Sequence, residues 1–242
     1  PINRIQTFFI ESDNNGFLKI TLEKKDTLEV TAILQNEEGN ELNRFTTTGN
    51  YIDFKVENPV LWNAENPYLY KLILQTKDEI IGEKVGFRKI EILDGAVCLN
   101  GVPIKIRGVN RHESNPETGF YVSYDFAFME LKLMKEHNIN AIRTSHYPPS
   151  PWLLQMCDEM GFYVIDEADV EAHGSVEVSH TVDNNWDYSG ICYLANNPLF
   201  EFPILDRVQM MVFRDINRPS VIFWSLGNEA GFAKSFENAA RW

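Results

Sequence analysis

Four short groups of polar and ionisable residues interrupt the second half of the chain. They are Asn110-Arg111-His112-Glu113, Arg143-Thr144-Ser145-His146-Tyr147-Pro148, the segment 166–173 (DEADVEAH) and Trp224-Ser225-Leu226-Gly227-Asn228-Glu229. They hold three of the five histidines together with carboxylates and amides, the groups used for general acid–base catalysis, for hydrogen bonding to hydroxyls and for binding cations. Such side chains are costly to bury without partners, so we interpret the four groups as parts of one active site.

The Asn228-Glu229 pair is the candidate for proton transfer. It follows an almost wholly apolar run, so partial desolvation beside Trp224 would favour a protonated Glu229 carboxyl, as a general acid requires. Asn228 offers an amide that can both donate to and accept from a hydroxyl group. The structural alternative is that the pair simply begins the next helix, because Asn is a common N-cap.

The remaining candidates are a carboxylate and three imidazoles. Glu171 and His173 are two residues apart, so in an extended segment their side chains point to the same side and could bind a divalent cation. His112 and His146 each follow a predicted strand and could donate to a hydroxyl or an oxyanion. Each of these two could equally be an interior histidine with its hydrogen bonds satisfied.

The elements that must position these groups change character along the chain. Residues 1 to about 86 alternate apolar and polar positions with turn formers between the runs, as in Leu18, Ile20 and Leu22, which predicts a small antiparallel sandwich. Trp62 and Tyr68 could form a stacking platform for a sugar ring, but large aromatics that close one end of the sandwich are the simpler interpretation. Asp94-Gly95 and Asn100-Gly101 each predict a hairpin.

The second half alternates short apolar strands with helices, which is typical of a parallel α/β sheet. The carboxyl ends of its strands, where such folds build active sites, coincide with the four polar groups. We predict strands over 104–109, 141–143, 162–165 and 221–225, and helices over 124–137, 151–160, 202–216 and 233–242. The first helix is predicted to carry Phe128, Leu131 and Met134 on one face. Residues 172–200 have no clear periodicity and are predicted to be a long loop.

Composition limits the class of protein. The 242 residues carry a net charge of −13, which argues against nucleic acid or an anionic membrane surface as a partner. No apolar run reaches the 18 residues of a membrane span. Three cysteines without a close pair argue against a disulfide scaffold and favour a reducing, cytoplasmic location.

Three long runs resemble glycoside hydrolase family 2, and within it the β-galactosidases of the bacterial lactose-hydrolysing type. They are GVNRHE (108–113), NAIRTSHYPPSPWLLQMCDEMGFYVIDEADVEAHG (140–174) and RDINRPSVIFWSLGNEAG (214–231). NPVLWNAENPYLYKLILQ (58–75) is similar to the second sandwich domain of that family. The resemblance implies an immunoglobulin-like β-sandwich over residues 1–86, followed over 87–242 by the first four β/α units of a (β/α)8 TIM barrel.

The resemblance also implies roles for the polar groups. Glu229 matches the family's acid/base catalyst in retaining hydrolysis of terminal non-reducing β-D-galactose from lactose-like β-galactosides. Glu171, His173 and Glu229 match the ligands of a catalytic Mg²⁺, with Na⁺ a further cation of the full enzyme. His112 and His146 match residues that contact the galactose, and Asn228 matches one that bonds its 2-hydroxyl. The Glu-x-His pair after the third strand favours β-galactosidase over β-glucuronidase or β-mannosidase of the same family.

The nucleophile of such an enzyme is expected at the end of a later strand, beyond Trp242. We therefore expect this chain on its own to be inactive, and a half-barrel with open strand edges to associate, for instance as a homo-oligomer. The alternative from another class is a non-catalytic sugar- or metal-binding module.

Overall fold

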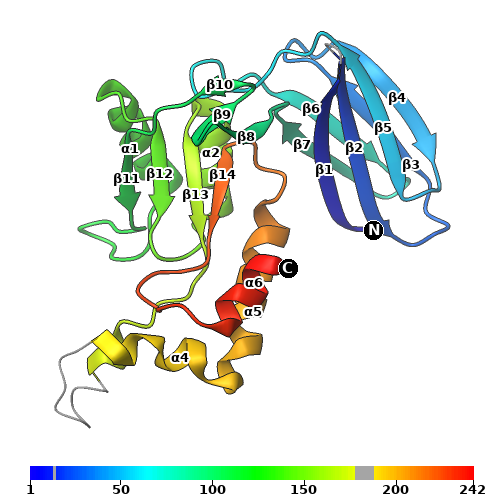
Figure 1. Cartoon of the computed structure of the whole chain (residues 1–242). Helices are drawn as coiled ribbons and strands as arrows, with labels where there is room; N and C mark the ends of the chain where they lie inside the picture. Colours follow the sequence, from blue (N-terminus) through cyan, green and yellow to red (C-terminus); the bar gives the residue numbers. More distant parts are fainter. Residues whose placement is uncertain (13–14, 178–187) are drawn as a thin grey trace. The chain divides into compact units, whose positions relative to one another are not determined.

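The computed structural model describes residues 1–12, 15–177 and 188–242 (Figure 1). The chain divides into two compact units. The first comprises Pro1–Ile106, Gln155–Phe162 and Ile216–Ser220, and the second Arg107–Leu154, Tyr163–Asp215 and Val221–Trp242. Each unit is described below by itself.

The first unit is built on two antiparallel sheets. One has the strand order β1-β2-β5, with β1 at Ile2–Ser12, β2 at Asn15–Lys24 and β5 at Tyr51–Glu57. The other has the order β4-β3-β6-β7, with β4 at Glu41–Thr47, β3 at Val30–Gln35, β6 at Tyr70–Gln75 and β7 at Ile80–Val85. In β2 and β5 every second side chain is buried, the pattern that the alternation in the sequence predicts.

Both sheets contribute to one hydrophobic core. Its members are Leu18, Ile20, Leu22, Val30, Ala32, Leu34, Ile52, Phe54, Val56, Tyr70, Leu72, Leu74, Val85 and Phe87. Trp62 is fully buried and its indole Nε1 donates to the Asp158 carbonyl at 2.8 Å. It therefore offers no face to a sugar, and the stacking platform is ruled out for Trp62.

A third, small antiparallel sheet has the order β10-β9-β8, with β8 at Ile90–Leu93, β9 at Ala96–Leu99 and β10 at Val102–Pro103. The predicted hairpins join these strands. Asp94, Gly95, Asn100 and Gly101 all have positive φ, as tight turns between twisted strands require.

The three cysteines are free, as predicted.

A buried ion cluster lies in the same unit. The Arg218 guanidinium donates to Asp158 Oδ2 at 3.1 Å and to Glu83 Oε2 at 2.6 Å, and the Ser220 backbone N–H donates to Asp158 Oδ1 at 2.9 Å. Burial raises the pKa of Asp158 to about 6, although Arg218 and Ser220 act against this shift.

The second unit contains a parallel sheet in the order β11-β12-β13-β14. The strands are β11 at Gly108–Arg111, β12 at Ala141–Thr144, β13 at Tyr163–Glu167 and β14 at Val221–Ser225. All four arrows point the same way in Figure 1. The four polar groups of the sequence therefore begin at the same edge of one sheet.

The helices that lie wholly within the described residues are α1 at Tyr124–Glu136, α2 at Pro151–Met160, α4 at Tyr193–Asn196, α5 at Glu201–Asp215 and α6 at Lys234–Arg241. The bounds predicted for α2 and β14 are those observed. The first strand was predicted too early, at 104–109, whereas β11 begins at Gly108. On α1, Ala127 and Leu131 are buried, whereas Phe128, predicted to share a face with Leu131, is 47% exposed.

The predicted loop 172–200 is helical in part. Residues 178–187 lie outside the described residues. After them come two 3-10 helices, η1 at Tyr188–Cys192 and η2 at Pro198–Phe200, on either side of α4. Ala195 of α4 belongs to a hydrophobic cluster with Val208 and Met211 of α5 and Phe236 of α6, so this segment packs as part of the second unit.

Candidate active site

The loops that follow β13 and β14 run side by side. The Ala168 N–H donates to the Ser225 carbonyl at 2.9 Å, and the Asn228 N–H donates to the Val170 carbonyl at 2.8 Å. A further parallel bridge pairs Glu171 with Asn228. Sheet-like pairing thus continues beyond both strands, and this brings the 166–173 and 224–229 groups together.

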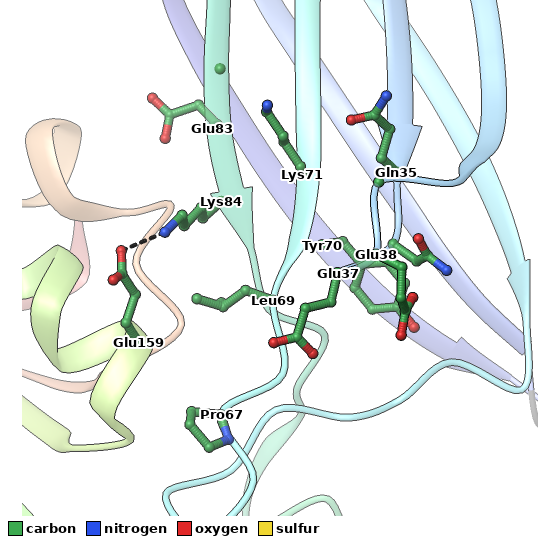
Figure 2. Close-up of a pocket in the computed structure, with 13 residues that line it drawn as sticks. Gln35, Glu37, Glu38, Pro67, Leu69, Tyr70, Lys71, Glu83, Lys84 and Glu159 are labelled. Carbon is green, nitrogen blue, oxygen red and sulfur yellow. Dashed lines mark hydrogen bonds and ion pairs between the residues drawn. The ribbon is translucent and has the colours of Figure 1, made fainter.

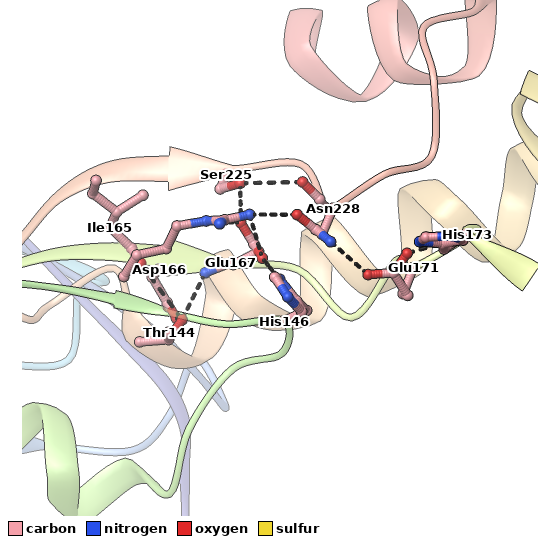
Figure 3. A network of polar contacts seen from close by, with 11 residues as sticks. Thr144, His146, Ile165, Asp166, Glu167, Glu171, His173, Ser225 and Asn228 are labelled. Atoms are coloured by element: carbon pink, nitrogen blue, oxygen red, sulfur yellow. Dashed lines mark hydrogen bonds and ion pairs between the residues drawn. The ribbon is translucent and has the colours of Figure 1, made fainter. Parts of the chain in front are cut away.

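Glu167, the last residue of β13, lies at the centre of the polar network in Figure 3. Its side chain has no exposed surface. Arg143 donates from Nε to Oε2 at 2.7 Å and from Nη2 to Oε1 at 3.0 Å, Ser225 Oγ donates to Oε2 at 2.6 Å, and His146 Nδ1 lies 2.8 Å from Oε1. Burial raises the pKa of this carboxyl, but the hydrogen bonds from Ser225, His146 and Arg143 outweigh burial and leave the pKa below its ordinary value.

The side chain of Asn228 is held from both ends. Its Oδ1 accepts from Arg143 Nη2 at 2.9 Å, and its Nδ2 donates to Glu171 Oε2 at 2.6 Å (Figure 3). The N-cap of α6 is Ala233, so Asn228 does not cap the next helix and the structural alternative for this pair is wrong.

The two histidines predicted to contact a substrate lie together. The rings of His112 and His146 meet edge to face, with centroids 5.1 Å apart. An ionised carboxylate can only accept a hydrogen bond, so the contact with Glu167 places the proton of His146 on Nδ1. In the neutral ring Nε2 is then an acceptor.

Glu229 has a different environment from Glu167. Its side chain is 50% exposed, so the desolvation that the sequence predicts for it does not occur in the described chain. Glu229 Oε2 contacts His173 Nδ1. The backbone of Glu229 has φ +41°, a left-handed conformation that few residues other than glycine adopt without strain.

The three residues predicted to hold a cation reach the same edge but do not surround one point. His173 and Glu229 contact each other, whereas the Glu171 carboxylate accepts from the Asn228 amide and, at 3.0 Å, from the His173 backbone N–H. Among the described residues no group of three His, Cys, Asp or Glu side chains is placed to hold a metal ion. Two carboxylates and an imidazole are nevertheless donors that a divalent cation accepts, so the chemistry of the set fits even though Glu171 would have to turn from Asn228.

A second layer of polar residues lies on the other face of β13. Thr144 Oγ1 accepts from the Glu167 N–H at 2.9 Å and donates to Asp166 Oδ1 at 3.2 Å. Burial and the neighbouring Asp215 carboxylate raise the pKa of Asp166 to about 8, so Asp166 is neutral near pH 7. Asp215 itself is paired with Arg214 at 2.6 Å.

The structure therefore brings all six predicted site residues to one edge of the sheet, in two neighbouring sets. His112, His146, Asn228 and Glu171 belong to the network around Glu167 or contact it, and His173 pairs with Glu229. The roles of Arg143, Glu167 and Ser225 were missed. The signal in the sequence that could have found them is that Arg143 and Glu167, of opposite charge, lie at the ends of two consecutive predicted strands.

A groove of about 570 Å³ occurs elsewhere, in the first unit (Figure 2). Its lining includes Glu37, Glu38, Glu83, Glu159, Lys71 and Lys84. Lys84 already donates to Glu159 at 2.6 Å. Surface ion pairs of this kind do not indicate a particular chemistry.

Comparison with known proteins supports the assignment of the fold. Two solved β-glucuronidases cover nearly the whole chain. The one from Ruminococcus gnavus, in complex with D-glucuronic acid, has a TM-score of 0.83 and 24% identity, covering 98% of this chain and 39% of that one. The one from Dictyoglomus thermophilum has a TM-score of 0.80 and 22% identity, covering 99% and 41%. At these identities the likeness shows the fold alone: a sandwich domain with part of a TIM barrel.

Curated relatives are more similar in sequence. A β-galactosidase of Actinobacillus pleuropneumoniae is 45% identical, over 99% of this chain and 26% of that protein. A β-galactosidase of Staphylococcus xylosus is 39% identical, over 98% and 23%. The chain thus spans about a quarter of the length of these relatives.

Family models match both parts of the chain. The model for glycosyl hydrolases family 2 matches residues 4–88, and that for the TIM barrel domain of the same family matches residues 90–242. Among the described residues, none of the helices is long and apolar enough to cross a membrane. The parallel sheet, the carboxylates at its edge and these matches agree, and the chain belongs to glycosyl hydrolases family 2.

Proposed function

We propose that this chain provides the proton-donating side of a retaining β-galactosidase site, with Glu229 as the acid/base. The observation that carries the proposal is the contrast between two carboxylates at one edge of the sheet. Glu229 is half exposed beside Asn228, whereas Glu167 is buried and bonded on both oxygens. The relatives named β-galactosidase, at 39–45% identity, support the choice of substrate.

In this mechanism Glu229 protonates the leaving glycosidic oxygen and later removes a proton from water. Its Oε2 contacts His173, which leaves Oε1 to carry the proton. Asn228 and His146 bind sugar hydroxyls, because the amide retains a donor beyond its bond to Glu171 and the imidazole presents Nε2 as an acceptor.

Retention requires a second carboxylate about 5–5.5 Å from the first. Glu167 does not serve, because both of its oxygens already accept hydrogen bonds and it has no exposed surface. We assign the nucleophile to no described residue, and we expect the 242-residue chain to bind sugar without turnover.

Mg²⁺ bound by Glu171, His173 and Glu229 would place a positive charge beside the acid/base carboxyl. Titration calorimetry of the chain with Mg²⁺, and with Mn²⁺ as a second divalent cation that suits carboxylate ligands, tests this site. Heat of binding that disappears in Glu171→Gln and persists in Glu117→Gln, a change at an exposed loop glutamate, supports it. Equal affinity in the two variants contradicts it.

Self-association is part of the same proposal, because β11 and β14 are the edge strands of the four-stranded sheet. Light scattering over a concentration series tests it. A mass that stays at that of one chain, 27.9 kDa, at high concentration contradicts it.

The deciding assay for the activity uses the protein at its full natural length with nitrophenyl β-galactoside, and with nitrophenyl β-glucuronide and β-mannoside as competing substrates. We expect preference for the galactoside and a loss of at least 100-fold in kcat in Glu229→Gln, since general acid catalysis contributes about 10²–10⁴-fold. Preference for the glucuronide, or full activity in Glu229→Gln, overturns the proposal.

A further inference from the structure

We infer that Glu167 is a positioning residue, which together with Arg143 fixes the proton of His146 and the orientation of the Asn228 amide. The inference rests on the proposed function, because it assigns a role to Glu167 within the same site. Glu167 does not touch the substrate in this account. It acts through three side chains that come from the ends of β12 and β14.

The first step is the completeness of the Glu167 contacts. A carboxylate without exposed surface must have its charge compensated. Both Arg143 bonds form a paired arrangement with Nε on Oε2 and Nη2 on Oε1, which holds the two planar groups in one orientation. Ser225 Oγ on Oε2 and His146 Nδ1 on Oε1 then give each oxygen a second bond.

The second step concerns Asn228. Arginine carries only donors, so the amide atom that faces Arg143 Nη2 must be the oxygen. Glu171 carries only acceptors when ionised, so the atom that faces it must be the nitrogen. The same Nη2 group bonds Glu167 Oε1, which means that moving Glu167 moves the donor that orients Asn228.

The third step concerns His146. Its Nδ1 lies 2.8 Å from Glu167 Oε1, an acceptor, and this selects the ring form with the proton on Nδ1. In the neutral ring Nε2 then accepts a hydrogen bond from a hydroxyl group instead of donating one. The packing of His112 against the ring at 5.1 Å adds a steric limit but does not choose the proton position.

The test compares two variants that each remove the charge of a glutamate bonded to a buried or half-buried arginine. Glu167→Gln changes the positioning residue. Glu130→Gln is the matched control, because Glu130 accepts from the buried Arg111 at 2.8 Å and contacts neither His146 nor Asn228. Both variants keep the size of the side chain, so a general effect of an unpaired arginine appears in both.

The first measurement is made on the 242-residue chain by ¹⁵N NMR of the His146 ring and the Asn228 side-chain amide. We expect Glu167→Gln to change the Nδ1 and Nε2 shifts toward the other ring form and to move the amide signals, and Glu130→Gln to change neither. A merely structural role of Glu167 does not alter the proton position. Unchanged His146 and Asn228 signals in a folded Glu167→Gln chain overturn the inference.

Arg143→Lys covers the case in which Glu167→Gln does not fold. A lysine can bond only as a point donor, so we expect the Asn228 amide signals to move while His146 keeps its proton on Nδ1. Loss of the Nδ1 form, or an unmoved Asn228 amide, overturns the inference in this variant as well.

Kinetics of the full-length protein separate this inference from the proposed function. With a β-galactoside we expect Glu167→Gln to lower kcat by about 10–100-fold with little change in KM, because misplacement by about 1 Å costs up to 100-fold. If the wild type hydrolyses no β-galactoside but the NMR signals respond as expected, the proposed function fails and the positioning role stands. If the wild type is active and Glu167→Gln matches Glu130→Gln in both measurements, the positioning role fails alone.

Discussion

The Asn228 N–H donates to the Val170 carbonyl at 2.8 Å, and this bond joins the loop after β14 to the loop after β13. Gly227 precedes it with φ +141°, and a Cβ at that position would lie 2.4 Å from the Val170 oxygen. The approach of the two loops, and with it the contact of Glu171 with Asn228, depends on the missing side chain.

We therefore expect Gly227→Ala to lower the free energy of unfolding of the second unit by about 1–3 kcal/mol, since it adds both a clash and backbone strain. Denaturant unfolding measures the loss. Gly82→Ala is the control, because a Cβ there meets nothing within 4 Å. If the two variants are equally stable, the loop approach is less constrained than the structure indicates.

Asp166→Asn tests the neutral buried acid. The folded chain holds the Asp166 proton up to a pKa of about 8, whereas the unfolded chain releases it near the ordinary 3.8. The folded state therefore binds the extra proton between these values, so its contribution to stability is complete below about pH 4 and is lost as the pH rises through about 8. We expect wild-type stability to fall over this window and the Asn variant to show a flatter profile.

Urea unfolding at pH 5 and at pH 8.5 measures the difference. Asp206→Asn, at an exposed position on α5, serves as the control and should retain the wild-type slope. A wild-type slope in Asp166→Asn would mean that Asp166 is ionised in the folded chain.

Two leucines of α1 test which face of that helix is buried. Leu131 has no exposed surface, whereas Leu133 is 55% exposed. We expect Leu131→Ala to cost about 2–5 kcal/mol of unfolding free energy and Leu133→Ala less than about 1 kcal/mol. Phe128→Ala should resemble Leu133→Ala, and a large loss there would show that Phe128 is buried together with Leu131.

The buried ion cluster of the first unit gives a fourth prediction. Arg218→Met leaves Asp158 without its guanidinium partner, and we expect a loss of about 3–5 kcal/mol. Adding Asp158→Asn removes the unpaired charge and should recover much of the loss. A double variant no more stable than the single one would show that packing of the arginine, not its charge, matters here.

The elements with strong local signals could be predicted from sequence. Pro151 fixes the start of α2, and Gly161, with φ +75°, ends the segment after it. The start of β11 could not be located, because the apolar residues that precede Gly108 continue the alternation without pairing to β12. Periodicity records which residues suit a strand, but pairing to a neighbour decides where the strand begins.

The position of the site could be predicted from the sequence, but the hydrogen bonds within it could not. The edge of the sheet followed from polar residues after each strand. The bonds of Glu167 to Arg143 and Ser225 depend on the register between three strands, in which Glu167 is opposite Ser225. Register is a property of the assembled sheet, and no local pattern in one strand contains it.

Asp166 and Glu167 are adjacent in the chain, yet near pH 7 one carries a proton and the other a negative charge. Successive residues of a strand point to opposite faces of the sheet. The side chain of Asp166 therefore faces Asp215, and that of the next residue, Glu167, faces Arg143. Inserting one residue into β13 would interchange the two acids. The ionised glutamate would then face the Asp215 carboxylate. The aspartate, whose side chain is shorter, would face Arg143 and would be too short to reach it. A shift of β13 by one residue is therefore strongly disfavoured, and this fixes which side chains lie at the edge of the sheet.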